Sequence, residues 1–320
     1  MGAFKTATPT AAPPSAAAAS GWNSRQLEKM LEAHQAWTAQ LPGGVRAVMT
    51  RATLSDVRWR GVNLSRAQLD STSWLDADLS EADLSHAELQ FADLRGATLN
   101  RADLTAAKLD HARVQSCWLM GANLAEAKLS ETSLHNAHLE ESRWMEASMH
   151  LCPCNGAHFN RAQFHQARIF SCDFSGANFE GAHFHRARIQ MSRFYGAMLA
   201  DVNFGGAVLA SCNFTQCEMG GARFNAADLS RSCFIKAKMT FCDLREAKLS
   251  GCDLCGSELA SARFEGAHTL GADLRGANLK GARGLTSDQL AQARTDHTTV
   301  LPNGSNGPFV KRSGAEKPAR

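Results

Sequence analysis

A five-residue period runs through most of the chain and restricts its possible folds more than any other feature. From Ala77 to Leu104 every fifth residue is leucine, and alanine precedes each leucine by two positions. This period fits neither the 3.6 residues of a helical turn nor the 2.0 of a strand. The same register continues from Leu54 to Leu279 as about 45 consecutive pentapeptides without an insertion. The chain is therefore a repeat protein.

Each pentapeptide has the same order of residue sizes. The central position, i, is large and apolar, position i−2 is small, and position i−1 is often Asp or Asn. Residue types at i−2 also recur every 20 residues, which predicts that four pentapeptides form one coil. One such column contains Cys152, Cys172, Ser192, Cys212, Ser232 and Cys252. At the spacing of hydrogen-bonded strands, about eleven coils form a rod of about 50 to 55 Å.

These residues carry a specific resemblance to a known family. The motif A(D/N)Lxx of the pentapeptide repeat family stands here as Ala77-Asp78-Leu79, Ala122-Asn123-Leu124 and Ala177-Asn178-Phe179. The resemblance implies an all-β solenoid, a right-handed quadrilateral parallel β-helix of about 11 coils. Positions i and i−2 would point inward, and short helices would cap the two ends.

The sequence before the repeat predicts a helix that caps the first coil. Residues 1–21 are rich in Ala, Pro and Thr and are predicted to be disordered. Residues 22–53 are predicted to form a capping helix and lead-in, with the helix running from Ser24, as N-cap, to Leu41. The repeat itself is assigned to residues 54–284.

A second cover is predicted after the repeat. Thr286 and Gln289 form a capping box, and Leu285 with Leu290 forms the accompanying hydrophobic staple, so a helix begins there. We assign a C-terminal cap to residues 285–302 and a disordered basic tail to residues 303–320. With both ends covered, the protein is predicted to be a monomer.

The reactive side chains do not assemble into a catalytic pattern. Most of the ten cysteines occupy the small inward position, where a free thiol packs as a small apolar group, and this indicates a reducing cytoplasm. The two thiols and two imidazoles between His150 and His158 suggest a zinc site, but the register places Cys152 and Cys154 in the core, which argues against metal binding there. We predict no cofactor, no metal and no enzymatic activity.

The outward positions offer one candidate partner surface. Residues at position i−1 that are 20 positions apart form a column along the rod. The column that contains Lys128, Arg168 and Arg188 is the most basic one, and charged and apolar residues stand at the neighbouring corners. The alternative to a partner surface is an ordinary solvent-exposed face that binds no partner. The candidate surface consists of Lys108, Lys128, His165, Arg168, Phe170, His185, Arg186, Arg188, Met191 and Lys248.

Three functional classes remain open at this stage. We favour a non-catalytic scaffold or protein-interaction module with an unidentified protein partner, no nucleic acid and no membrane span. A second class is an accessory or effector component of a bacterial type VI secretion system, which rests on resemblance alone. A third is a DNA gyrase inhibitor or protector that imitates DNA. The slightly basic region after residue 150 opposes this third class, because a DNA mimic needs acidic surfaces.

Overall fold

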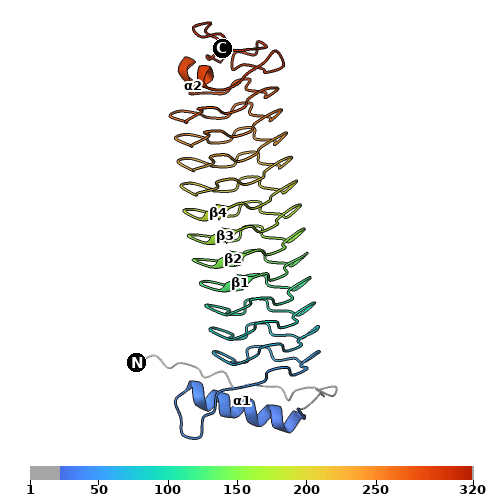
Figure 1. Ribbon diagram of the computed structural model, residues 1–320. Coiled ribbons are helices and arrows are strands. Elements are labelled where there is room, and N and C mark those ends of the chain that lie inside the picture. The colour runs from blue at the N-terminus through green and yellow to red at the C-terminus, as the bar shows by residue number, and fades with distance from the viewer. Residues whose placement is uncertain (1–21, 319–320) are drawn as a thin grey trace, which may run out of the picture.

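The computed structural model describes residues 22–318 as a rod of stacked coils with a helix at each end (Figure 1). The predicted parallel β-helix is confirmed, whereas the predicted disorder of residues 1–21 lies outside the described residues. In chain order the elements are α1 (Ser24–Thr38), β1 (Lys128–Ser130), β2 (Ser148–His150), β3 (Arg168–Phe170), β4 (Arg188–Gln190) and α2 (Ser287–Gln292).

Backbone pairing between residues 20 positions apart holds the coils together. The parallel ladder begins with Val48 opposite Gln68, one pentapeptide before the predicted start of the repeat. In a representative coil, the Leu79 N–H donates to the Thr98 carbonyl at 2.7 Å, and the Thr98 N–H donates to the Ala77 carbonyl at 2.8 Å. The predicted period of four pentapeptides per coil is therefore the period of the hydrogen bonds.

Each pentapeptide ends in a corner that needs a left-handed backbone. The residue two positions after i has a positive φ, as at Arg161 (58°) and at Gly181 (65°), which stands next to it on the following coil. Glycine adopts this conformation without steric cost, which explains why it recurs at this position. A turn hydrogen bond closes a typical corner, as from the Ala177 N–H to the Phe174 carbonyl at 3.0 Å.

The core consists of the residues at i, stacked on their counterparts in adjacent coils. The ring of Phe184 lies 4.6 Å from that of Phe164 and 4.8 Å from that of Phe204. Fully buried phenylalanines are concentrated in the middle of the rod: Phe159, Phe164, Phe174, Phe179, Phe184, Phe194, Phe204, Phe214, Phe224 and Phe234.

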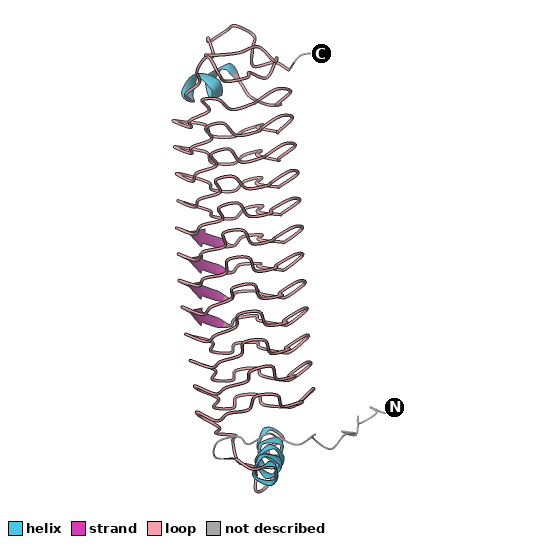
Figure 2. Ribbon diagram, turned by 90° about the vertical axis from the view of Figure 1, so that its right-hand side faces the viewer, coloured by secondary structure: helices cyan, strands magenta, loops and turns pink. Residues whose placement is uncertain are grey.

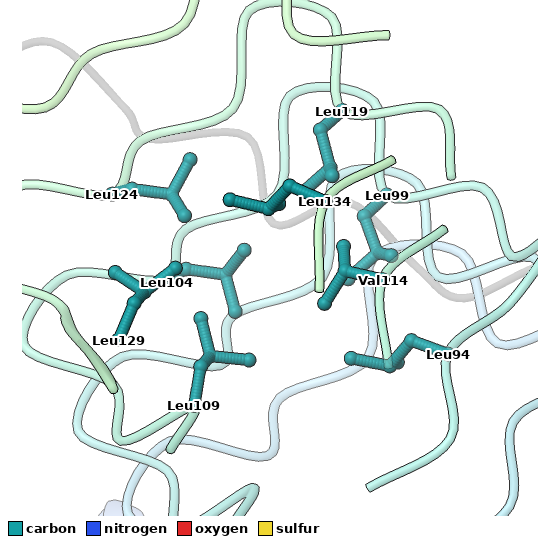
Figure 3. Close-up of a pocket in the computed structure, with 9 residues that line it drawn as sticks. All are labelled: Leu94, Leu99, Leu104, Leu109, Val114, Leu119, Leu124, Leu129 and Leu134. Carbon is teal, nitrogen blue, oxygen red and sulfur yellow. The ribbon is translucent and has the colours of Figure 1, made fainter. Parts of the chain in front are cut away.

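Leucine fills most of the first half of the rod and packs less completely than phenylalanine. A void of about 10 Å³ lies where these side chains converge on the axis (Figure 3). It is lined by Leu94, Leu99, Leu104, Leu109, Val114, Leu119, Leu124, Leu129 and Leu134. The lining is entirely apolar, so a water molecule would find no polar partner there.

Helix α1 covers the first coil, with boundaries that differ from the predicted ones. Asn23 is the N-cap instead of Ser24, because its side chain accepts from the Gln26 N–H and the Gln26 side chain accepts from the Asn23 N–H. The helix ends at Thr38, and Leu41 is exposed. His34 is fully buried, and its Nδ1 accepts from the Ala47 N–H at 3.0 Å, which attaches the helix to the start of the repeat.

Helix α2 closes the other end as its sequence predicts. The capping box is present: the Gln289 N–H donates to Thr286 Oγ1 at 3.2 Å, and the Thr286 N–H donates to Gln289 Oε1 at 2.6 Å. The amide of Gln289 also donates to the Ala267 carbonyl at 2.7 Å, so this helix binds the end of a coil directly. Beyond the helix the chain returns to the ladder, where Val300 pairs with Asn278.

Residues 303–318 differ from the disordered tail that the sequence predicts. This segment folds back over the cap, where the Phe309 N–H donates to Thr295 Oγ1 at 2.9 Å and Lys311 contacts Asp288 at 2.7 Å. Ala315 is buried. The prediction of disorder was based on composition alone. Composition does not show that Thr295 and Asp288 of the cap are available to bind this segment.

Substitutions at two adjacent residues test the register. Phe184→Asp places an unpaired carboxylate among stacked rings, which costs several kcal/mol, whereas His185→Asp changes an exposed neighbour. We expect thermal unfolding to show a lost or strongly lowered transition for Phe184→Asp and a nearly unchanged one for His185→Asp. Equal melting temperatures would show that the register is wrong.

Truncation tests the role of the C-terminal cap. Removing residues 285–320 exposes the apolar centre and unpaired backbone groups of the last coil, so we expect dimers or larger species by light scattering after size exclusion. Removing only residues 303–320 leaves α2 in place and should lower the melting temperature without association. A monomeric, soluble fragment ending at residue 284 would contradict the capping role.

Candidate interaction surface

The basic column predicted from the sequence exists as one line of paired residues. Backbone bridges and strand pairs join its members in sequence from Gln68 to His268. Its middle contains the four strands, which stack along one edge of the rod (Figure 2). Their first residues are Lys128, Ser148, Arg168 and Arg188, and each of these points outward, followed by an inward residue.

Ion pairs between adjacent coils neutralise many charges on the rod. Glu218 and Lys238 lie 2.6 Å apart and Asp173 and Arg193 lie 3.3 Å apart, in each case 20 residues apart in sequence. Two members of the candidate surface are neutralised in the same way. Lys108 contacts Glu88 at 3.3 Å, and Lys248 contacts Asp228 at 3.5 Å. The two ends of the candidate surface are therefore neutralised within the protein.

The middle of the column differs, because its cations face one another. Arg168 stands directly opposite Arg188 in the pairing of β3 with β4. Paired residues on adjacent strands lie about 4.8 Å apart, and like charges directly opposite destabilise a sheet. Among residues 22–318, Lys128, Arg168, Arg186 and Arg188 have no ion-pair partner. We call Arg168, Arg186 and Arg188, with the histidines described next, the basic patch.

Three histidines complete the basic patch at the corner that precedes the arginines. His165 and His185 occupy the same position on successive coils, and the rings of His165 and His183 lie 6.1 Å apart. Burial lowers the pKa of His165, and the neighbouring His183 and His185 lower it further. The arrangement concentrates imidazoles beside guanidinium groups.

No carboxylate interrupts the patch on the two faces that carry it. These faces are formed in three successive coils by residues 163–171, 183–191 and 203–211, and none of these segments contains Asp or Glu. Before them stands Glu146, and after them stands Asp228. The region without carboxylates therefore extends over three coils.

Exposed apolar side chains border the patch on its other side. Phe170 stacks on His150 with ring centroids 5.4 Å apart, and its exposed fraction is 40%. Met191 and Leu151 are also exposed, at 61% and 46%. The surface predicted from the sequence includes Phe170 and Met191 but not His150, Leu151 or His183, although these three residues also follow from a comparison of columns 20 residues apart.

The column of small inward residues shapes the corner into which the strands lead. There the Cys172 N–H donates to Ser192 Oγ at 3.2 Å, and the Cys212 N–H donates to Ser232 Oγ at 2.9 Å. The Cys212 thiol in turn donates to the Ile189 carbonyl at 3.4 Å. These side chains thus provide hydrogen bonds at a corner, in addition to the apolar packing that the sequence predicts.

The buried thiols are poorly suited to reaction. Burial raises the pKa of the Cys212, Cys217 and Cys242 thiols to about 12, which keeps the reactive thiolate scarce. Cys152 and Cys154 are buried, as the register predicts. Across the part of the chain that the structure describes, no three His, Cys, Asp or Glu residues are placed to hold a metal ion.

Family models match most of this repeated architecture. The pentapeptide repeat model matches in eight copies between residues 47 and 199, and a second model, for a pentapeptide repeat region, matches residues 207–283. The chain belongs to the pentapeptide repeat family. No curated protein matches its sequence.

Solved structures of other pentapeptide repeat proteins are distant from this chain. HetL, a protein involved in heterocyst differentiation regulation from the cyanobacterium Nostoc sp. strain PCC 7120, is 22% identical, with 89% of this chain and 100% of HetL covered and a TM-score of 0.32. QnrB1, a plasmid-mediated fluoroquinolone resistance protein, is 18% identical, with 69% and 91% covered and a TM-score of 0.27. In the described part of this pentapeptide repeat protein, neither helix has the length and apolar character needed to cross a membrane.

Proposed function

We propose that this protein is a non-catalytic scaffold that binds a protein partner through the middle of its basic column. The observation that carries the proposal is the pairing of Arg168 with Arg188 without a compensating carboxylate. At other places, such as Glu88 and Lys108, opposite charges lie on adjacent coils. Arg263 also faces Arg283, but there Glu265 pairs with Arg263 at 3.8 Å, whereas Arg168 and Arg188 both lack an ion-pair partner among the described residues. A bound partner that supplies negative charge would offset the repulsion that the free protein carries.

The surrounding surface supports a protein as the partner. Exposed apolar groups next to arginines are the composition found at the centres of protein interfaces. Phe170 and Met191 provide such groups beside Arg168 and Arg188. The rigid stack of coils holds these side chains in fixed positions, so a partner meets a surface that is already formed.

The proposal also includes a role without catalysis, a cytoplasmic location and a monomeric state. Thiols that donate hydrogen bonds inside the rod act as structural groups, and this supports a role without catalysis. All ten cysteines are free, which fits a reducing cytoplasm. A monomer is supported by the helices that cover both ends.

The two alternative functions gain no comparable support. Imitation of DNA requires a continuous acidic surface, whereas this rod pairs several of its carboxylates with cations on the next coil and has a basic middle. A role in a type VI secretion system predicts no particular feature of this surface. It therefore stays a prediction that only the identity of the partner can test.

Charge reversal on two different faces tests the proposal. We expect the triple variant Lys128→Glu, Arg168→Glu, Arg188→Glu to lose a partner that the wild-type protein captures from its native cells, because the new carboxylates repel it. The matched control reverses Arg101, Lys236 and Lys280, which are exposed cations on columns outside the basic patch. Mass spectrometry of the captured proteins measures the difference. Equal capture by both variants would remove the basic column from the proposed function.

A further inference from the structure

We propose that the basic patch binds an acidic protein segment with interspersed apolar side chains, and that His165, His183 and His185 make this binding tighter as the pH falls. This inference rests on the proposed function and specifies the partner's chemistry and its regulation. It depends on three observations: the unpaired guanidinium groups, the apolar border and the three clustered imidazoles.

The guanidinium groups define the charge of the partner. Arg168 and Arg188 stand on neighbouring strands, and Arg186 is exposed at the adjacent corner of the same coil as Arg188. Arginine binds carboxylates with two parallel hydrogen bonds, which makes it well suited to a row of Asp or Glu side chains. Because the strands lie about 4.8 Å apart, neighbouring acidic side chains of one segment can each meet a different guanidinium.

The next coil leaves room for the backbone of such a segment. On the faces that continue the patch it carries Gly205, Gly206, Val208 and Ala210, which project little beyond the backbone. A Cβ added at Gly206 would find its nearest neighbour, the Arg186 side chain, 4.0 Å away. The partner can therefore approach this coil closely while its side chains reach back to the arginines.

The apolar border favours a protein over a nucleic acid. Phe170, Met191 and Leu151 are exposed beside the patch, and a partner that covers them needs apolar side chains next to its carboxylates. The region without carboxylates extends over only three coils, or about 14 Å. A duplex binds through a longer row of phosphate contacts, and here Glu146 and Asp228 stand at the two limits of the region.

The histidines give the interaction its pH dependence. The titratable side chains that act on His165 are those of His183 and His185. On the preceding coil the Glu146 N–H donates to the His165 carbonyl, and Arg143 stands opposite Gln163. In the free protein burial and the two imidazoles hold the pKa of His165 below its usual value. A carboxylate placed beside the cluster favours the imidazolium and raises the pKa, so the complex takes up protons. By linkage, the affinity increases as the pH falls from 8 to 6, while the carboxylates of the partner stay ionised.

Fluorescence anisotropy with a labelled synthetic peptide of Glu-Glu-Phe repeats tests this inference on the full-length protein. We expect the dissociation constant to fall at least about fivefold between pH 8 and pH 6, since one fully linked proton contributes up to about tenfold per pH unit. The variant His165→Gln, His183→Gln, His185→Gln should bind with little change over this range. The variant Arg168→Glu, Arg188→Glu should bind at least about tenfold more weakly at both pH values.

The control and the contrary outcomes separate this inference from the proposed function. Arg101→Glu, Lys236→Glu changes the same net charge at exposed positions on columns outside the basic patch and should bind the peptide like the wild-type protein. Absence of peptide binding, or tighter binding of a labelled DNA duplex at equal ionic strength, would overturn the acidic-protein assignment. Binding that is independent of pH would overturn the role of the histidines. Either failure leaves the capture experiment with native cells as the separate test of the scaffold function.

Discussion

Hydrogen bonding between residues 20 positions apart determines almost every other property of this structure. Because the pairing is parallel and unslipped from Val48 to the C-terminal cap, each side chain stands next to the residue 20 positions before it and the residue 20 positions after it. Inside the rod this produces columns of stacked rings, such as Phe164, Phe184 and Phe204. Outside it produces columns of charges whose neighbours are fixed by the sequence. The ends of the stack have no next coil, and helices α1 and α2 cover them.

The fold could be predicted from the sequence because the repeat records the register directly. Alanine at i−2 and leucine at i identify the inward positions without any tertiary information, and the predicted core residues are buried. The terminal segments were harder, since their structure depends on contacts with the rod. Ser24 fits an N-cap by residue type, but the side chain of Asn23 makes the capping hydrogen bond. The segment after residue 302 resembles a tail in composition, yet Thr295 and Asp288 hold it in place.

The candidate surface could be predicted only in part. The sequence identifies which residues share a column, so the pairing of Arg168 with Arg188 follows from their numbers. It does not show which long side chains reach a partner. The ion pairs of Lys108 with Glu88 and of Lys248 with Asp228 remove two predicted members from the uncompensated surface. His183 was missed because it belongs to another column, and its closeness to His165 depends on how the coil turns at the corner.

The central claim is that the rod maintains facing arginines for binding at a cost in stability. The free energy of unfolding of Arg188→Glu measures this cost directly, because the substitution places a carboxylate opposite Arg168, in the arrangement found elsewhere on the rod. The result we predict is an unfolding free energy equal to that of the wild-type protein or higher by up to about 1 kcal/mol. A decrease of more than about 1 kcal/mol would contradict the claim, because it would show that the two arginines already stabilise the free protein.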